Sequence, residues 1–179
     1  NFTINNTSNS TITVATGDTL NVNGTLTLTD GEIVTGTIAA KGAVVSIGAG
    51  FGLANNASGT LLVNGAGVQT VSITPQTTAT FEVVDQLTIN NTDATVQGTG
   101  TTGRIGLDKI TLTDGTIDFT GYTLDANEAV SSADVFTLGS GTNTFTGTTA
   151  PLTITAGTFD AGTGTPVFGG AFSISAGTF

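Results

Sequence analysis

Short phrases recur along this chain of 179 residues, and their spacing limits the possible folds more than any other feature of the sequence. The phrase ITAGTF ends at Phe159, and its near-copy ISAGTF ends at Phe179, 20 residues later. The stretch that begins at Leu87 aligns with the stretch that begins at Ile110, 23 residues later. A repeat of roughly 20 to 24 residues is too short to bury a core by itself, so successive repeats must stack on one another.

Within each repeat, apolar residues alternate with small polar ones, as in residues 19–31, 109–121 and 151–159. This period of two, with many β-branched residues, predicts strands, and the Gly, Asn-Gly and Asp-Gly steps predict corners. Only residues 123–136 combine helix formers with little glycine, and there we expect one or two helical turns or a looped excursion. The pattern as a whole predicts an all-β protein, a parallel β-solenoid of about eight coils of 20–24 residues.

The alignment also predicts which residues stack and which way they face. It places Ile89 on Leu112, Ala94 on Ile117 and Val96 on Phe119. The C-terminal phrases place Ile154 on Ile174 and Phe159 on Phe179. We expect Ile89, Leu112, Ile154 and Ile174 to be buried. Because side chains alternate along a strand, the residue before each of them should face outward.

A longer repeat overlies the short one. FTINNT at residues 2–7 recurs as LTINNT at 87–92, and LTLTDG at 26–31 recurs as ITLTDG at 110–115. These phrases indicate an internal duplication of about 85 residues, 1–85 and 86–170, within a single solenoid of residues 1–179. Two β-sandwich modules divided near residue 85 would give the same duplication, but they would pair their strands antiparallel across short turns.

Composition excludes several functions. Thirteen carboxylates against three cations give a formal charge of −10, which disfavours nucleic acid and anionic membranes as partners. The longest apolar run, residues 43–54, is too short to cross a bilayer, so we expect no membrane insertion. The chain has no His and no Cys, so the common nucleophile–base pairs and zinc sites cannot be built, and we expect no cofactor.

The densest group of titratable residues lies between residues 104 and 128, and within it Asp114 and Asp118 could form a carboxylate pair, similar to the acidic clusters of parallel β-helix enzymes that act on polysaccharides. Incidental calcium binding is a second alternative for these residues. The simpler interpretation is that Asp114 and Gly115 form a corner and that the other charges face solvent, so we expect no enzymatic activity. Asp30 to Glu32 lacks the oxygen ligands of a calcium loop. The glycine-rich stretches 48–52 and 98–103 precede no helix that could hold a phosphate, and we expect them to be corners.

Runs of Thr-x-Thr, as at residues 25–29 and 153–158, suggest an alternative function. They are similar to the threonine arrays with which some β-solenoid antifreeze proteins bind ice. Such an array needs Thr-x-Thr on the same face of most coils. In this sequence the pairs drift among the coils and alternate with Asn, Ser and Asp.

In residues 20–31, 61–73 and 156–170 the chain resembles the large secreted bacterial repeat proteins that fold as right-handed parallel β-solenoids. These include filamentous haemagglutinin-like adhesins and autotransporter passengers. The resemblance implies an extracellular, cell-surface protein with a structural or adhesive role. It carries no catalytic residues over to this chain.

Both ends of the sequence are strand-like: the chain begins with NFTINNT and ends with AFSISAGTF. A solenoid that ends in a strand exposes unpaired backbone groups and bare core, which favours the addition of another coil. We therefore expect head-to-tail association of this chain with itself, or continuation within a longer solenoid. The residues expected at the two assembly ends are Phe2, Ile4, Phe172, Ile174 and Phe179.

Overall fold

The computed structural model describes residues 1–5, 11–51, 58–76, 84–100, 102–131, 135–147 and 151–179. These residues form strands and corners, and none of them is helical. The strands are β1 Phe2–Asn5, β2 Thr11–Thr13, β3 Thr19–Val22, β4 Leu26–Thr35, β5 Thr37–Ala40, β6 Val44–Phe51, β7 Thr60–Val63, β8 Gln69–Ile73, β9 Val84–Gly98, β10 Arg104–Asp118, β11 Thr123–Ser131, β12 Val135–Thr137, β13 Thr142–Phe145, β14 Leu152–Ile154, β15 Thr158–Asp160, β16 Thr165–Phe168 and β17 Ser173–Ile174.

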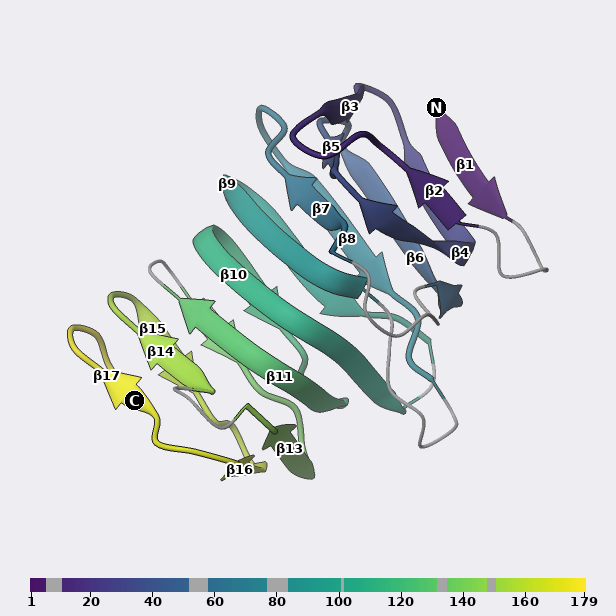
Figure 1. Cartoon of the computed structure of the whole chain (residues 1–179). Coiled ribbons are helices and arrows are strands. Elements are labelled where there is room, and N and C mark those ends of the chain that lie inside the picture. Colours follow the sequence, from purple (N-terminus) through teal and green to yellow (C-terminus); the bar gives the residue numbers. More distant parts are fainter. Residues whose placement is uncertain (6–10, 52–57, 77–83, 101, 132–134, 148–150) are drawn as a thin grey trace.

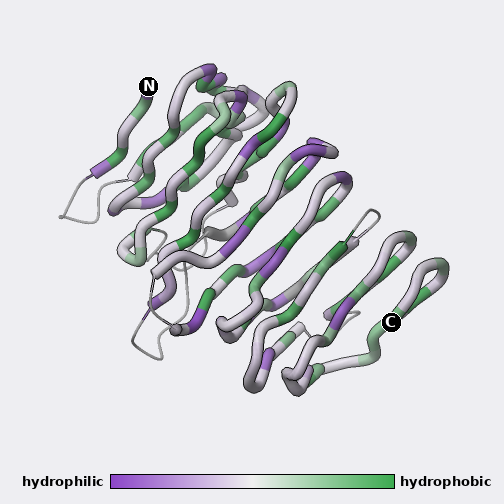
Figure 2. The backbone as a smooth tube through the Cα atoms, turned by 180° about the vertical axis from the view of Figure 1, so that it is seen from behind, coloured by the Kyte–Doolittle hydropathy of each residue, from purple (hydrophilic) through white to green (hydrophobic). Residues whose placement is uncertain are grey.

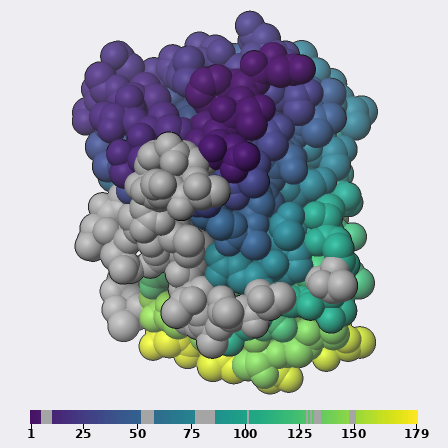
Figure 3. Space-filling view, turned by 90° about the vertical axis from the view of Figure 1, so that its right-hand side faces the viewer, coloured from purple at the N-terminus to yellow at the C-terminus, as the bar shows by residue number. Residues whose placement is uncertain are grey.

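The strands wind into a three-sided parallel β-solenoid, with the N-terminus at one end of the stack and the C-terminus at the other (Figure 1). The first face contains β1, β6, β8, β12 and β15, together with parts of β4, β9 and β10. The second face contains β3, β5, β7, β14 and β17, together with parts of β9, β10 and β11. The third side lies between them and includes β2, β13, β16 and the first halves of β10 and β11. The space-filling view shows the same order of layers, from purple to yellow (Figure 3).

The register between turns can be followed in columns of stacked residues, with one residue from each turn. The first-face column that points inward runs Phe2, Leu26, Val45, Val71, Val96, Ile117, Phe136, Phe159. Its steps vary from 19 residues (Leu26 to Val45) to 26 (Val45 to Val71), because the corners differ in length. The solenoid has about six regular turns, slightly fewer than the eight expected, since the first and last turns are built from short, exposed strands.

The predicted fold class is therefore confirmed, and the alternative of two β-sandwich modules is wrong. Among the described residues, every pairing between named strands is parallel, and the antiparallel contact that the structure does show is an isolated bridge between Gln76 and Arg104. The 85-residue duplication stays a prediction. Phe2 lies on the first face and Leu87, its counterpart, on the second. Asn6 and Thr7 of the first copy lie outside the described residues.

The core is a continuous stack of apolar side chains inside the three walls, and apolar segments recur along successive turns (Figure 2). The predicted facing is confirmed for Ile89, Leu112 and Ile154, which are buried, while Ile174 on the last turn is only partly buried. The residues that precede these four are half-buried or exposed, as expected for outward positions.

The predicted register holds before a corner and fails after it. Ile89 pairs with Leu112, as expected, but Val96 pairs with Ile117 rather than with Phe119. The register shifts because the corner that follows Ile89 contains two more residues than the corner that follows Leu112. Stacking therefore changes by two residues within a single turn, which keeps apolar side chains inside.

The expected helical or looped segment at 123–136 is a strand over Thr123–Ser131. Leu124 and Ala126 face inward and pair with Ile105 and Leu107 of the preceding turn. The open edge of β10 supplies hydrogen-bond partners along this segment, and burial between two turns outweighs its local helix propensity.

Candidate assembly surface at the two ends of the solenoid

Among the described residues of the acidic stretch, no three carboxylates come together. Asp114 lies at a corner, where its Oδ2 accepts a hydrogen bond from Thr92 Oγ1 at 3.3 Å. Asp118 lies on the outer side of the first face and accepts from the backbone N–H of Thr120 at 2.9 Å. The Asp118 bond therefore shapes a local turn, whereas the Asp114 bond links two adjacent turns of the solenoid. The side chain of Glu128, at the end of this stretch, lies outside what the structure describes.

Arg104 and Asp125 form an ion pair on the third side, one turn apart. The Asp125 side chain is 2% exposed and that of Arg104 is 43% exposed. Oδ1 of Asp125 is buried and accepts no hydrogen bond among the described residues. Two backbone hydrogen bonds with Gln76, of 2.8 and 3.2 Å, hold Arg104 in place. Sequence reasoning treated these charges as solvated, because nothing local indicates that Asp125 is covered.

Buried side-chain amides form hydrogen bonds at several corners. Their burial was not predicted from the sequence. Gln69 Nε2 donates to the carbonyl oxygens of Ala40 and Gly42, at 3.0 and 2.7 Å. Gln69 Oε1 accepts from the backbone N–H of Gly65 and from Nδ2 of Asn91. These bonds satisfy polar groups in three successive turns and give this region a structural role.

The Asp30–Gly31 and Asp114–Gly115 steps turn corners within β4 and β10, whereas residues 48–51 of the first glycine-rich stretch, which we expected to be a corner, belong to strand β6. In the Asp30 turn, the N–H of Gly31 donates to Asp30 Oδ1 at 2.8 Å, and Gly31 has a φ of 108°. Gly115 follows Asp114 with a φ of 102°. Gly52 and Thr101, in the two glycine-rich stretches, lie outside the described residues.

Outward threonines do not form a regular array on the first face. One outer column reads Val44, Thr70, Thr95, Thr116, Val135, and its neighbouring column reads Ser46, Ser72, Gln97, Asp118, Thr137. Thr-x-Thr therefore does not repeat across these consecutive turns. On the first face, the Thr-x-Thr pairs therefore shift position from turn to turn, as the sequence indicated.

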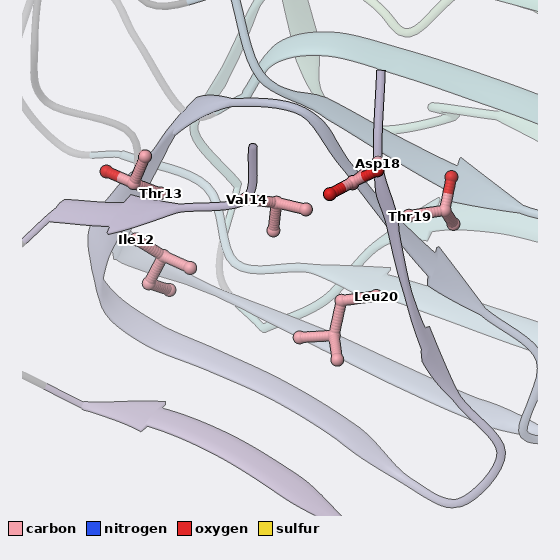
Figure 4. A pocket seen from close by; sticks show the side chains of 6 residues that line it. All are labelled: Ile12, Thr13, Val14, Asp18, Thr19 and Leu20. Atoms are coloured by element: carbon pink, nitrogen blue, oxygen red, sulfur yellow. The ribbon is translucent and has the colours of Figure 1, made fainter. Parts of the chain in front are cut away.

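The first turn leaves an open hollow of about 460 Å³ at the N-terminal end of the solenoid. It is lined by Ile12, Thr13 and Val14, at and just after β2, and by Asp18, Thr19 and Leu20, at the start of β3. In Figure 4 the Ile12, Val14 and Leu20 side chains line the hollow, and the Asp18 carboxylate points toward Val14. Its lining is mixed, because Thr13, Asp18 and Thr19 stand beside the three apolar residues.

Of the residues expected at the N-terminal assembly end, Phe2 is half-buried and Ile4 is 8% exposed. Ile4 pairs with Leu28 of the next turn, which accounts for its burial. Leu20, which the sequence did not single out, is 37% exposed. At this end Leu20 of β3 is therefore more exposed than Phe2 and Ile4 of β1.

The C-terminal end presents a cluster of phenylalanine rings. The Phe172 ring lies 4.8 Å from the Phe168 ring and 5.9 Å from the Phe179 ring, measured between centroids. Phe179 stacks in turn on buried Phe159 at 5.3 Å, which matches the stacking predicted from the repeated phrase. Phe172 and Phe179 remain 46% and 59% exposed, and Ile174 is partly buried against Ile154.

The chain matches no family model, no curated protein and no solved structure. The fold places it in the class of repeat-built parallel β-solenoids. Across the described residues, no helix is long and apolar enough to span a membrane. In the same residues, His, Cys, Asp and Glu form no group of three that could hold a metal ion.

Proposed function

We propose that this chain is a structural or adhesive element of an extracellular, cell-surface fibre, in which solenoid follows solenoid head to tail. The following turn comes from another subunit or from further coils of a longer chain. The exposure along the second-face column carries this proposal. Ile38, Leu61, Leu87, Ile110, Ala129 and Leu152 are all 0% exposed, whereas Leu20, which begins the column, is 37% exposed.

A parallel solenoid grows by repetition of one contact. Each added turn pairs its backbone with the turn below and covers that turn's apolar side chains. β3 and β17 are short, but each pairs in parallel with one neighbouring turn as the strands between them do with two, and the other edge of each is free within the described chain. Extension at either end therefore repeats an interaction that the molecule already makes many times.

The surface chemistry suits an exposed, passive role. Only 9% of the residues are charged, and the outer columns of the first face consist mainly of Thr, Ser and Val. Hydroxyl-rich, weakly charged walls can make many weak polar contacts with another surface, which is the chemistry of adhesion. The absence of Cys means that stability is independent of the redox state outside the cell.

Electron microscopy of the purified 179-residue chain, over a range of concentrations, tests the proposal. We expect unbranched filaments one solenoid wide, with lengths that increase with concentration. Sedimentation velocity should show the same shift toward larger species. A chain that remains monomeric at the highest concentration reached would exclude fibre formation by separate subunits.

A further inference from the structure

We propose that the Asp30–Gly31 step is a site of spontaneous backbone modification, at which the aspartate converts into isoaspartate through a cyclic succinimide. This inference does not depend on the proposed fibre function. Four steps of the chain combine the side chain and the glycine that this chemistry needs: Asn23–Gly24, Asp30–Gly31, Asn64–Gly65 and Asp114–Gly115. The structure distinguishes three of them by the contacts of the glycine and of the side chain before it.

The reaction involves only the aspartate, the glycine that follows it, and water. The backbone nitrogen of the glycine attacks the protonated side-chain carboxyl group at Cγ, the nitrogen loses its proton, and the hydroxyl group leaves with that proton as water. A water molecule then opens the five-membered ring. When it attacks the backbone carbonyl carbon, the main chain afterwards runs through Cβ and Cγ, and the product is isoaspartate. One water is released and one is consumed, so the net change is an isomerisation.

At Asp30 the structure holds the two reacting groups side by side. The backbone N–H of Gly31 donates to Oδ1 of Asp30 at 2.8 Å, so the carboxyl group lies next to the nitrogen that must attack it. Gly31 has a φ of 108° and carries no Cβ atom that could obstruct the approach to Cγ. Ring closure therefore requires a local rotation of the side chain rather than a movement of the whole strand.

The parallel ladder is irregular at Asp30, which leaves the peptide group room to adjust. Asn5 and Gly50 pair with Asp30 from the two adjacent turns, and a register shift precedes Asp30 in both pairings. Isoaspartate adds one carbon atom to the main chain. A corner can absorb this addition, whereas within a regular strand it would interrupt the alternation of side chains.

Asp114–Gly115 is the matched comparison, because both steps end the same phrase, Thr-Leu-Thr-Asp-Gly. Oδ2 of Asp114 accepts a hydrogen bond from Thr92 Oγ1 of the preceding turn at 3.3 Å. Gly115 packs so closely on that turn that a Cβ atom would lie 2.6 Å from the carbonyl oxygen of Asn91. These contacts hold both the carboxyl group and the glycine in place, so Asp114 should convert more slowly than Asp30.

Asn64–Gly65 has both of its groups engaged elsewhere. The N–H of Gly65 donates to Oε1 of buried Gln69 at 2.6 Å, away from the Asn64 side chain. Oδ1 of Asn64 accepts from Nζ of Lys41, in the preceding turn, at 3.4 Å. The same reaction at asparagine would release ammonia, and we expect these two hydrogen bonds to keep Asn64 unmodified.

Peptide mapping of the complete 179-residue chain, after incubation near neutral pH, tests the proposal. Trypsin cuts at the three cations of the chain and places Asp30, Asn64 and Asp114 on different peptides. Electron-transfer fragmentation locates isoaspartate, and deamidation of Asn23, which shares a peptide with Asp30, is recognised by its change in mass. We expect isoaspartate to accumulate at Asp30 at least about fivefold faster than at Asp114.

The chain unfolded in urea is the control. Both Asp–Gly steps then keep only their shared local sequence and should convert at similar rates. In the folded chain, Asp30→Glu should abolish conversion at this position, because the longer side chain cannot close a five-membered ring. Folded protein in which Asp114 converts as fast as Asp30, or in which Asp30 does not convert, would overturn the proposal. So would an isoaspartate signal on the first tryptic peptide that persists in Asp30→Glu.

Discussion

Arg104 and Asp125 show how one side chain can depend on a residue a full turn away. Asp125 is almost completely buried, and Arg104 reaches it from the preceding turn while remaining partly exposed. The two residues therefore differ in what happens to each charge when the ion pair is lost. Arg104 can turn toward water, whereas Asp125 cannot. A buried charge that loses its partner is strongly destabilising.

This asymmetry predicts unequal losses of stability. We expect Arg104→Gln to lower the free energy of unfolding by up to about 3 kcal/mol, since it leaves the Asp125 carboxylate buried without its cation. Asp125→Asn should cost clearly less. Urea unfolding of the two variants measures the difference, and equal losses would show that the pair acts symmetrically.

At the scale of the elements, corners determine how strands stack. β9 and β10 are each 15 residues long and pass around a corner without leaving the parallel ladder. At the corner of β10, Gly115 has a φ of 102°, a conformation that residues with a side chain rarely adopt. A Cβ atom at this position would lie 2.6 Å from the carbonyl oxygen of Asn91 in the adjacent turn.

We therefore expect Gly115→Ala to destabilise the protein by more than Gly121→Ala. Gly121 also has a positive φ, of 87°, but a Cβ atom there would meet no atom within 4 Å. Both substitutions strain the backbone by about 1–3 kcal/mol. The difference in stability between the two variants therefore measures the collision with the neighbouring turn. Thermal unfolding midpoints provide the measurement. Similar midpoints for the two variants would mean that the turns move apart easily.

At the scale of the whole molecule, the two carboxylates that could have formed a pair lie apart in function, Asp114 at a corner and Asp118 on an outer wall. Asp114 and Asp118 each engage a nearby Thr rather than forming a described pair with one another. The proposed fibre role requires no reactive centre, and on that proposal these carboxylates serve folding and solubility.

Replacement of both residues, Asp114→Asn with Asp118→Asn, should change the free energy of unfolding by no more than about 1 kcal/mol, as is usual for solvent-facing positions. Neither the wild type nor the variant should release reducing ends from an acidic polysaccharide. The control is heat-denatured protein. Cleavage by the wild type that disappears in the variant would contradict the assignment as a non-enzyme.

The sequence by itself determined the class of fold and the facing of most strands. Alternation with a period of two is a local property, and the recurrence of ITAGTF as ISAGTF requires stacking at a fixed spacing, so Leu112 and Ile154 could be placed in the core directly. Only the tertiary structure decided the register between successive turns. Two extra residues in one corner shift the pairs that follow that corner in the same turn. The tertiary structure also decided that Asp125 is buried and that Leu20 is more exposed than the residues with which it stacks, since both depend on which turns lie above and below.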